Sequence, residues 1–168
     1  MIKMIVAMDK TNQAIGNKNK LLWDLPEDMK FFRETTKNTI VVMGYNTYKS
    51  IGKPLPKRLN IVLSQNNKEE NTENLIFYNN FDKLLEDLKN IDKTIFIIGG
   101  SQIYRLFLPY TEELYVTLIH KQNEELFEAD TYFPNFKNDF TMINSSDIYL
   151  SEKQNLYYQF TCWKNNNK

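Results

Sequence analysis

The sequence of 168 residues is poor in the residues that form disulfides, ligate metals or cross membranes. It contains one cysteine, Cys162, and one histidine, His120, which excludes an intrachain disulfide and a site built from several Cys and His ligands. No apolar run approaches the ~20 residues of a membrane span or has the form of a signal peptide. We therefore expect a cytoplasmic protein with no membrane partner and no metal site.

The charges of the chain balance, with 21 Lys and Arg against 21 Asp and Glu. No net field draws the protein to nucleic acid, so any charged ligand must be met by local groups. With 42% hydrophobic and 14% aromatic residues the chain can build one core. We predict a single domain over residues 1–168, and a monomer, because nothing in the sequence requires an oligomer.

Short apolar runs alternate with helical patterns over the first two thirds of the chain. The runs at 2–8, 39–43, 60–63, 75–78 and 94–98 predict buried strands, and the patterns at 26–36, 45–50, 81–88 and 101–108 predict helices. From residue 114 onward, strands at 114–120, 140–144 and 156–164 follow without helices and should pair antiparallel. The sequence predicts an α/β fold whose mostly parallel sheet has an antiparallel C-terminal edge.

Residues 9–23 have little periodicity and are expected to form a long loop. A plain surface connection is one reading of such a loop. Its apolar residues Ile15, Leu21, Leu22 and Trp23 favour the other reading, a lid over a ligand.

One acid, Asp28, lies on the apolar side of the first predicted helix. That apolar stripe follows Leu25, Met29, Phe32 and Thr36, whereas Glu27, Lys30 and Glu34 fall on the solvated side. A first-turn acid gains ~0.3–1 kcal/mol from the helix dipole, which is the ordinary explanation. An inward carboxylate costs several kcal/mol unless a cation or a donor meets it, so we predict a partner for Asp28. Burial should raise its pKa, which suits recognition of a protonated heterocycle or assistance to proton transfer.

Two strand-to-helix turns contain glycine, at Gly44 and at Gly99–Gly100. Glycine lets the backbone approach a ligand, and the unpaired N–H groups of such a turn can meet an anion. Neither turn has the G-x-G-x-x-G spacing, so a purely structural turn explains each one alone. Two such turns in one sheet offer a place for a pyrophosphate.

Three further residues carry open interpretations. The segment 51–58 has two prolines that fix its backbone, and its Arg58 could grip a carboxylate in bidentate fashion, although solvated charge explains most such runs. Thr117 shares a strand face with apolar residues, which is ordinary for a threonine in a strand. We assign no role to His120.

These residues fall in blocks that together resemble the dihydrofolate reductase family along essentially the whole chain. The blocks are I-V-A, A-I-G, N-K-N-K-L-L-W-D-L-P-E-D, V-M-G-Y-N-T-Y-K-S-I-G-K-P-L-P-K-R, I-V-L-S, I-I-G-G-S-Q-I-Y and L-Y-V-T, in that order. The resemblance implies NADPH-dependent reduction of 7,8-dihydrofolate to tetrahydrofolate, in support of one-carbon and thymidylate metabolism. It also implies a central eight-stranded, largely parallel sheet with four helices, and antifolates such as methotrexate or trimethoprim as inhibitors.

The resemblance also implies roles for particular residues. Asp28 would be the catalytic acid that hydrogen-bonds the pterin ring, joined by Thr117 through its hydroxyl and a water, while Arg58 would pair with the glutamate tail of folate. Walls around the pterin and benzoyl groups would come from Ile5, Val6, Ala7, Phe32, Ile51, Leu55 and Ile98. Contacts with the cofactor would come from Ala7, Ile15, Gly16, Asn19, Leu21, Gly44, Tyr45, Asn46, Thr47, Leu63, Ser64, Gln65, Gly99, Gly100, Ser101, Gln102, Ile103 and Tyr104. The Gly99–Gly100 peptide would be cis, and residues 12–23 would be the mobile lid.

The chain departs from the family where the 2′-phosphate of NADPH is held. Many members have arginine or lysine at positions that match Tyr45, Asn79 and Gln102, and this chain has none there. Ser64 and Gln65 could still donate hydrogen bonds. Because a charge-assisted hydrogen bond contributes ~1.5–3 kcal/mol, we predict a smaller preference for NADPH, with NADH tolerated, unless Lys49 or Lys68 reaches the phosphate. Leu22 and Tyr48 replace a common proline and tryptophan and are conservative changes.

Two other functions remain open on the sequence. One is a folate- or dinucleotide-binding protein with this fold and a structural role, which would bind without turnover. The other is a reductase of a related pterin or pyrimidine. Arg58 favours folate over these substrates, because the resemblance implies that it pairs with the glutamate tail of folate.

Overall fold

The structure is a computed structural model that describes residues 1–66 and 69–168. These residues form two compact units, which we call unit 1 (Met1–Met4 and Thr35–Thr111) and unit 2 (Ile5–Glu34 and Glu112–Lys168). The first strand, β1 (Ile2–Asp9), contributes residues to both units. Six of its eight residues are buried, which confirms the buried strand predicted at residues 2–8.

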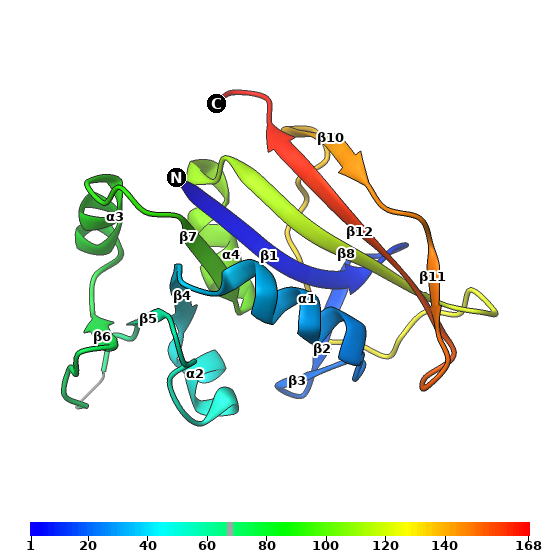
Figure 1. The fold of residues 1–168 in the computed structure, drawn as a ribbon, viewed down its shortest axis with the longest axis horizontal. Coiled ribbons are helices and arrows are strands. Elements are labelled where there is room, and N and C mark those ends of the chain that lie inside the picture. The colour runs from blue at the N-terminus through cyan, green and yellow to red at the C-terminus, as the bar shows by residue number, and fades with distance from the viewer. Residues whose placement is uncertain (67–68) are drawn as a thin grey trace. The chain divides into compact units, whose positions relative to one another are not determined.

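Unit 1 is built on parallel strands. The start of β1 pairs with β7 (Ile95–Gly99), β7 with β4 (Ile40–Gly44), β4 with β5 (Leu59–Leu63) and β5 with β6 (Leu75–Tyr78), all in parallel. Three helices follow strands directly, α2 (Tyr45–Ile51) after β4, α3 (Phe81–Lys89) after β6 and α4 (Ser101–Phe107) after β7 (Figure 1). The apolar face predicted for α3 is confirmed, since its three leucines are buried. The predicted parallel sheet is therefore present.

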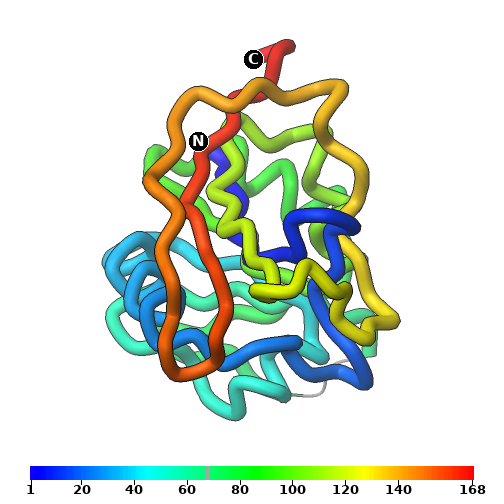
Figure 2. Tube along the Cα trace, turned by 90° about the vertical axis from the view of Figure 1, so that its right-hand side faces the viewer, coloured from blue at the N-terminus to red at the C-terminus, as the bar shows by residue number. Residues whose placement is uncertain are grey.

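Unit 2 is built on antiparallel strands. Its longest strand, β12 (Leu156–Asn165), pairs with β8 (Glu113–Lys121), β10 (Phe140–Ser145) and β11 (Tyr149–Ser151). Figure 2 shows β10 and β11 in orange running beside β12 in red. The strand order is β10-β12-β8-β1-β7-β4-β5-β6. The described residues thus form a mixed α/β fold with four α-helices and a central eight-stranded, mostly parallel sheet, which confirms the predicted antiparallel edge.

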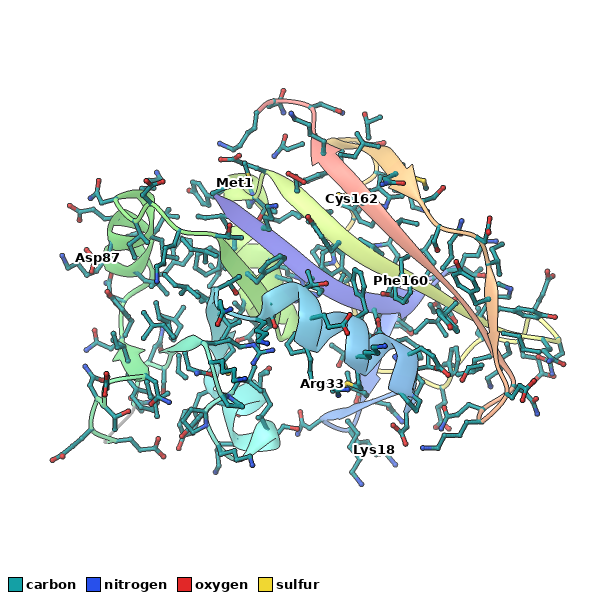
Figure 3. The ribbon with its side chains drawn as sticks, viewed as in Figure 1. Met1, Lys18, Arg33, Asp87, Phe160 and Cys162 are labelled. Atoms are coloured by element: carbon teal, nitrogen blue, oxygen red, sulfur yellow. The ribbon has the colours of Figure 1, made fainter. Side chains whose placement is uncertain are left out.

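The loop predicted at residues 9–23 is wrong in part, because this segment contains a short hairpin. Its strands are β2 (Ala14–Asn17) and β3 (Lys20–Leu21), and β2 also pairs with β9 (Thr131–Tyr132). The turn between β2 and β3 uses Lys18 and Asn19 with positive φ angles, and Figure 3 labels Lys18 at this tip. Strands of two to four residues are too short for an alternation of apolar residues to reveal them.

Helix α1 (Pro26–Thr36) begins at the predicted proline, but its apolar stripe is displaced from the prediction. Met29 is 41% exposed, whereas Leu25 is almost fully buried. Phe31 stacks on Phe160 of β12 with ring centroids 4.4 Å apart, and Figure 3 labels Phe160 on the face of the unit 2 sheet that α1 covers. The inward side of α1 is therefore centred on Asp28 and Phe31, so the membership of Met29 in the stripe was wrong.

The end of α4 also differs slightly from the prediction. The α-helix ends at Phe107, and a 3-10 helix, η1 (Leu108–Tyr110), contains Pro109. Proline fits there because the first residues of a helical turn need no N–H partner. Among the described residues, no helix has both the length and the apolar composition to span a bilayer.

Candidate functional site

Asp28 has the partner that its position predicts. The hydroxyl of Thr117, on β8, donates a hydrogen bond of 2.8 Å to Oδ1 of Asp28. Thr117 is 2% exposed, so its hydroxyl is held in one place. The contact is direct, which is closer than the hydroxyl-and-water link that the resemblance implies. Thr117, which the sequence alone did not distinguish from other strand threonines, is therefore the hydrogen-bond partner of Asp28.

The surroundings of Asp28 raise its pKa above 3.8. Burial is the larger cause, and the hydrogen bond from Thr117 partly opposes it by favouring the charged form. Residues next to both partners belong to one apolar cluster. Leu25 lies one helical turn before Asp28, Ile119 lies two residues after Thr117, and both pack in this cluster with Trp23. The predicted rise in pKa is confirmed. A carboxyl with a raised pKa holds its proton more strongly than a solvated one, which marks Asp28 as a candidate functional group.

The neighbouring acid, Glu27, has a different partner and a different environment from Asp28. Both of its carboxylate oxygens accept hydrogen bonds from the hydroxyl of Ser151, at 3.1 and 3.3 Å. Asp28, the next residue of the same helical turn, has instead an environment in which desolvation is the main cause of its raised pKa. The difference comes from the side of α1 on which each residue lies.

The two glycine turns lie next to each other in unit 1. β4 and β7 are parallel neighbours, and Met43 is in register with Gly99, so both strands end at the same edge. α2 begins after Gly44 and α4 after Gly100, and neither helix has a side-chain cap among the described residues. The backbone N–H groups of the two first turns are therefore presented together at the carboxyl ends of parallel strands, where open α/β sheets bind ligands.

Close packing favours glycine at positions 44 and 99 of these turns. A Cβ on Gly44 would come within 2.9 Å of Cγ1 of Ile103, and a Cβ on Gly99, whose φ is +117°, would lie 3.2–3.3 Å from the phenol of Tyr104. A Cβ on Gly100 would lie 3.6 Å from Oγ1 of Thr47. The Gly99–Gly100 peptide is cis, as the resemblance implies. Ile103, Tyr104 and Thr47 thus shape the backbone that the resemblance assigns to the cofactor.

Arg58 is held by its own unit. Its Nε donates 2.9 Å to Oγ1 of Thr36, which is fully buried at the end of α1, and its Nη1 donates to the carbonyl oxygen of Pro56. The prolines of this segment therefore fix the guanidinium as well as the backbone. A guanidinium with a fixed plane suits bidentate binding of a carboxylate.

The remaining residues assigned by the resemblance are distributed over both units. In unit 2, Ile5 and Val6 are buried in β1, Ala7 and Phe32 are half-buried, and Ile15 and Gly16 lie in β2. Also in unit 2, Asn19 is exposed and Leu21 is 68% exposed at the hairpin tip. Unit 1 holds Ile51, Leu55, Leu63, Ser64, Gln65 and Ile98 with the two glycine turns and their followers Tyr45, Asn46, Ser101 and Gln102.

Sequence reasoning missed Asp130, which anchors the hairpin of residues 14–21. Its Oδ2 accepts a hydrogen bond of 3.0 Å from the backbone N–H of Lys18, and its own N–H donates 3.0 Å to the carbonyl oxygen of Gly16. The backbone hydrogen bond from Lys18 is the main reason that the pKa of Asp130 lies below 3.8. The two partners are 112 residues apart in the chain, so no local pattern could have revealed them.

The described residues contain no group of His, Cys, Asp and Glu that could hold a metal ion. His120 stacks on Tyr157, and its Nδ1 is buried without a hydrogen-bond partner. Burial lowers the pKa of His120, which keeps the ring neutral. The geometry around it shows no ligand set.

A half-buried acid with a raised pKa on a helix, and paired glycine turns at the ends of parallel strands, are features expected of a nucleotide-binding α/β protein. Comparisons with known proteins identify its family. The family model described as dihydrofolate reductase matches residues 1–165. The dihydrofolate reductase of Bacillus subtilis is 36% identical over 99% of this chain and 96% of its own length. That of Haemophilus influenzae is 33% identical over 91% of each chain.

Among solved structures, the dihydrofolate reductase from Enterococcus faecalis complexed with NADP(H) and RAB-propyl superimposes with a TM-score of 0.84, covering 99% of this chain and 96% of that one at 30% identity. The chain belongs to the dihydrofolate reductase family. Its activity is accordingly that of an NADPH-dependent oxidoreductase that reduces dihydrofolate.

Proposed function

We propose that the residues described above carry out this reduction in a defined division of roles. Asp28 is the catalytic residue of the chain, Thr117 orients it, Arg58 binds the glutamate tail of dihydrofolate and the two glycine turns bind the pyrophosphate of NADPH. The observation that supports the proposal most strongly is the hydrogen bond of 2.8 Å from Thr117 to a desolvated Asp28.

Asp28 acts on the pterin ring through its carboxylate. A carboxylate in a desolvated place pairs strongly with the N–H groups of a protonated heterocycle, because little water competes with it. The raised pKa of Asp28 also lets it carry a proton itself at moderately acidic pH. Asp28 thereby favours protonation at N5 of the pterin, with the proton itself supplied by water.

Thr117 fixes which oxygen of Asp28 remains for the substrate. Its hydroxyl occupies Oδ1, so Oδ2 is the oxygen that we assign to the pterin. Because a hydroxyl accepts as well as donates, the Oγ1 of Thr117 can also receive a hydrogen bond from the ring or from a water.

The glycine turns fit the cofactor that the family uses. Bulkier residues would close them, since a Cβ on Gly44 meets Ile103 at 2.9 Å. NADPH, when bound, supplies the hydride that is transferred to C6 of the pterin. In unit 1, the chain's own part is to hold the pyrophosphate by backbone N–H groups and the glutamate tail by Arg58, and Ile51, Leu55 and Ile98 would help to exclude water. In unit 2, its part is to hold the pterin by Asp28, with Ile5, Val6 and Phe32 as apolar neighbours of the ring.

We further propose that residues 12–23, which contain the hairpin of residues 14–21, are the lid. Asp130 would be its anchor, because hydrogen bonds of 3.0 Å join Asp130 to backbone groups of residues 16 and 18. The whole chain acts as a single domain and a cytoplasmic monomer, in support of one-carbon metabolism. Antifolates such as methotrexate or trimethoprim would compete with dihydrofolate for Asp28.

The direct test is oxidation of NADPH, followed at its nicotinamide absorbance, with and without dihydrofolate. We expect turnover that requires dihydrofolate and is abolished by methotrexate. Tight binding of both ligands without turnover would contradict the proposal and favour a structural role.

A further inference from the structure

We infer that Glu69, joined to Tyr45, lies at the ribose end of the cofactor site and lowers the discrimination between NADPH and NADH. The inference rests on the proposed function, because it uses the two glycine turns as the place of the pyrophosphate. All of the residues concerned belong to unit 1.

The topology of unit 1 determines which strand end lies beside the ribose. The two glycine turns follow β4 and β7, which are neighbours, and β5 lies on the other side of β4 with Leu63 in register with Gly44. A nucleotide whose pyrophosphate lies on the turns can therefore extend its adenosine over the carboxyl end of β5. In nucleotide-binding α/β folds, the residues at the end of the next strand distinguish a ribose 2′-hydroxyl from a 2′-phosphate.

The side chains at this place are uncharged or acidic. β5 is followed by Ser64 and Gln65, and the first residue after Gly44 is Tyr45, whose hydroxyl donates a long hydrogen bond of 3.4 Å to Oε1 of Glu69. The charge of Glu69 also reaches Tyr48, where it contributes, after burial, to a raised pKa of that phenol. A carboxylate thus faces the tyrosines of α2.

The one cation placed here among the described residues lies on the face of the same tyrosine. Nζ of Lys49 is 5.7 Å from the centroid of the Tyr45 ring, on the ring face and not at the hydroxyl that meets Glu69. Asn79 and Gln102 are exposed amides. Lys68, the other lysine considered for this role, lies outside the described residues. Lys49 and Glu69 thus contact different parts of the Tyr45 side chain.

The charge of Glu69 predicts a different effect on the binding of NADPH and of NADH. A 2′-phosphate carries about −1.5 to −2 charges at neutral pH and would be repelled by Glu69. The 2′-hydroxyl of NADH can donate to the same carboxylate, which is the interaction that selects NAD in dinucleotide-binding folds. Glu69 therefore favours NADH and counteracts the attraction that Lys49 exerts on NADPH.

The test compares kcat/KM for NADPH and NADH, with dihydrofolate as the common substrate. We expect the parent protein to use both, with a preference for NADPH below about tenfold, the lower limit of a single charge-assisted hydrogen bond. Glu69→Gln should raise the ratio about tenfold and Glu69→Arg further, through KM and not kcat, because the ribose is remote from the transferred hydride. Glu70→Gln is the matched control, an exposed acid one residue away, and should change the ratio less than twofold.

A binding measurement without turnover gives a second readout. The ratio of the Kd values of 5′-AMP and 2′,5′-ADP should rise in Glu69→Gln and stay constant in Glu70→Gln. A parent preference for NADPH above about 1000-fold, or a ratio unchanged in Glu69→Gln, overturns the inference while leaving the proposed function intact. Absence of turnover with both cofactors overturns the proposed function instead. A collapse of the preference in Lys49→Met together with no effect of Glu69→Gln would assign the selection to Lys49 and also overturn the inference.

Discussion

The two units present different kinds of candidate binding group. Unit 1 offers backbone groups, since Gly44 and Gly99 leave space where a Cβ would be too close to its neighbours, and the turns expose N–H groups at strand ends. Unit 2 uses a side chain, Asp28, whose properties are changed by burial and by one hydroxyl. The backbone site depends on shape, whereas the side-chain site depends on charge. Substitutions in the two units should therefore differ in the ligand whose binding they weaken, in the pH dependence of the effect and in its magnitude.

The largest effect should come from Asp28→Asn, which removes the charge and keeps the shape. We expect kcat at neutral pH to fall about a hundredfold or more, the usual contribution of a group that assists proton transfer. Part of the loss should be recovered at acidic pH, where dihydrofolate is protonated in solution. Stopped-flow or steady-state rates between pH 5 and pH 8 measure this. Glu27→Gln, on the partly solvated side of α1, is the control, and full activity of Asp28→Asn at neutral pH would refute the role of the charge.

The next largest effect should come from Arg58→Leu, which removes a guanidinium that we propose to bind the substrate by charge. Dihydrofolate and methotrexate should bind about 2–4 kcal/mol more weakly, because the tail carboxylate loses its bidentate partner. Fluorescence titration gives the two Kd values. Lys57→Met serves as the control, since it removes an exposed neighbouring cation. Equal weakening in both variants would mean that only the general positive charge of this segment matters.

A smaller effect, confined to the cofactor, should come from Gly44→Ala. The added methyl meets Cγ1 of Ile103 at 2.9 Å, an overpacking that costs about 1–3 kcal/mol, and the displaced turn should raise KM for NADPH more than KM for dihydrofolate. Gly52→Ala separates packing from backbone strain. A Cβ on Gly52, whose φ is +87°, would meet no other atom within 4 Å, so this variant should lose stability while KM for NADPH stays constant. A similar rise in KM for both variants would show that general destabilisation, not the shape of the turn, limits cofactor binding.

The smallest effect should come from Thr117→Val, which keeps the volume and removes the hydrogen bond. Because that bond lowers the pKa of Asp28, its loss should raise the pKa further and move the pH–rate profile to higher pH. A carboxyl whose pKa is raised on folding favours the folded state below its unfolded pKa, near 3.8, and loses this contribution as the pH rises through the folded pKa. The variant should therefore lose more stability at pH 7 than at pH 4.

Thr161→Val is the control for this measurement. It removes another buried hydroxyl of the same sheet, which donates to the carbonyl oxygen of Val116 and meets no carboxylate. Its loss of stability should be the same at both pH values, and its pH–rate profile should match that of the parent. A profile that also stays fixed in Thr117→Val would mean that Asp28 is not the group whose titration limits the rate.

The difference between the units also explains how far sequence could predict the fold. The inner strands of unit 1, such as β4, are buried on both faces, so continuous apolar runs such as residues 40–43 mark them without a partner being known. The strands β2, β3, β9 and β11 have two to four residues, and only their pairing with other strands defines them. Helix α1 was placed correctly, but its inward side depends on the stacking of Phe31 on Phe160, which sequence spacing does not contain.

Some features of the candidate site could likewise be predicted from the sequence, and others could not. Spacing alone placed Asp28 inward and predicted a partner and a raised pKa, and the structure confirms all three. That the partner is Thr117 came from the resemblance, since a threonine on an apolar strand face has many ordinary explanations. The contacts of Arg58 with Thr36 and of Asp130 with Lys18 join residues 22 and 112 positions apart, and neither has a local signature. The assigned roles of these residues stay predictions until the variants are measured.

The outermost strand has a consequence for handling the protein. β10 is the first strand in the order of the sheet, and its residues Met142 and Ile143 are exposed in a stretch that has no charge from Phe140 to Ser146. Such a stretch can template further strands when the protein is concentrated or warmed. Asp139 and Asp147 flank it at both ends, as gatekeepers do. Resistance to aggregation at this edge therefore depends on two acids to which we assign no part in catalysis.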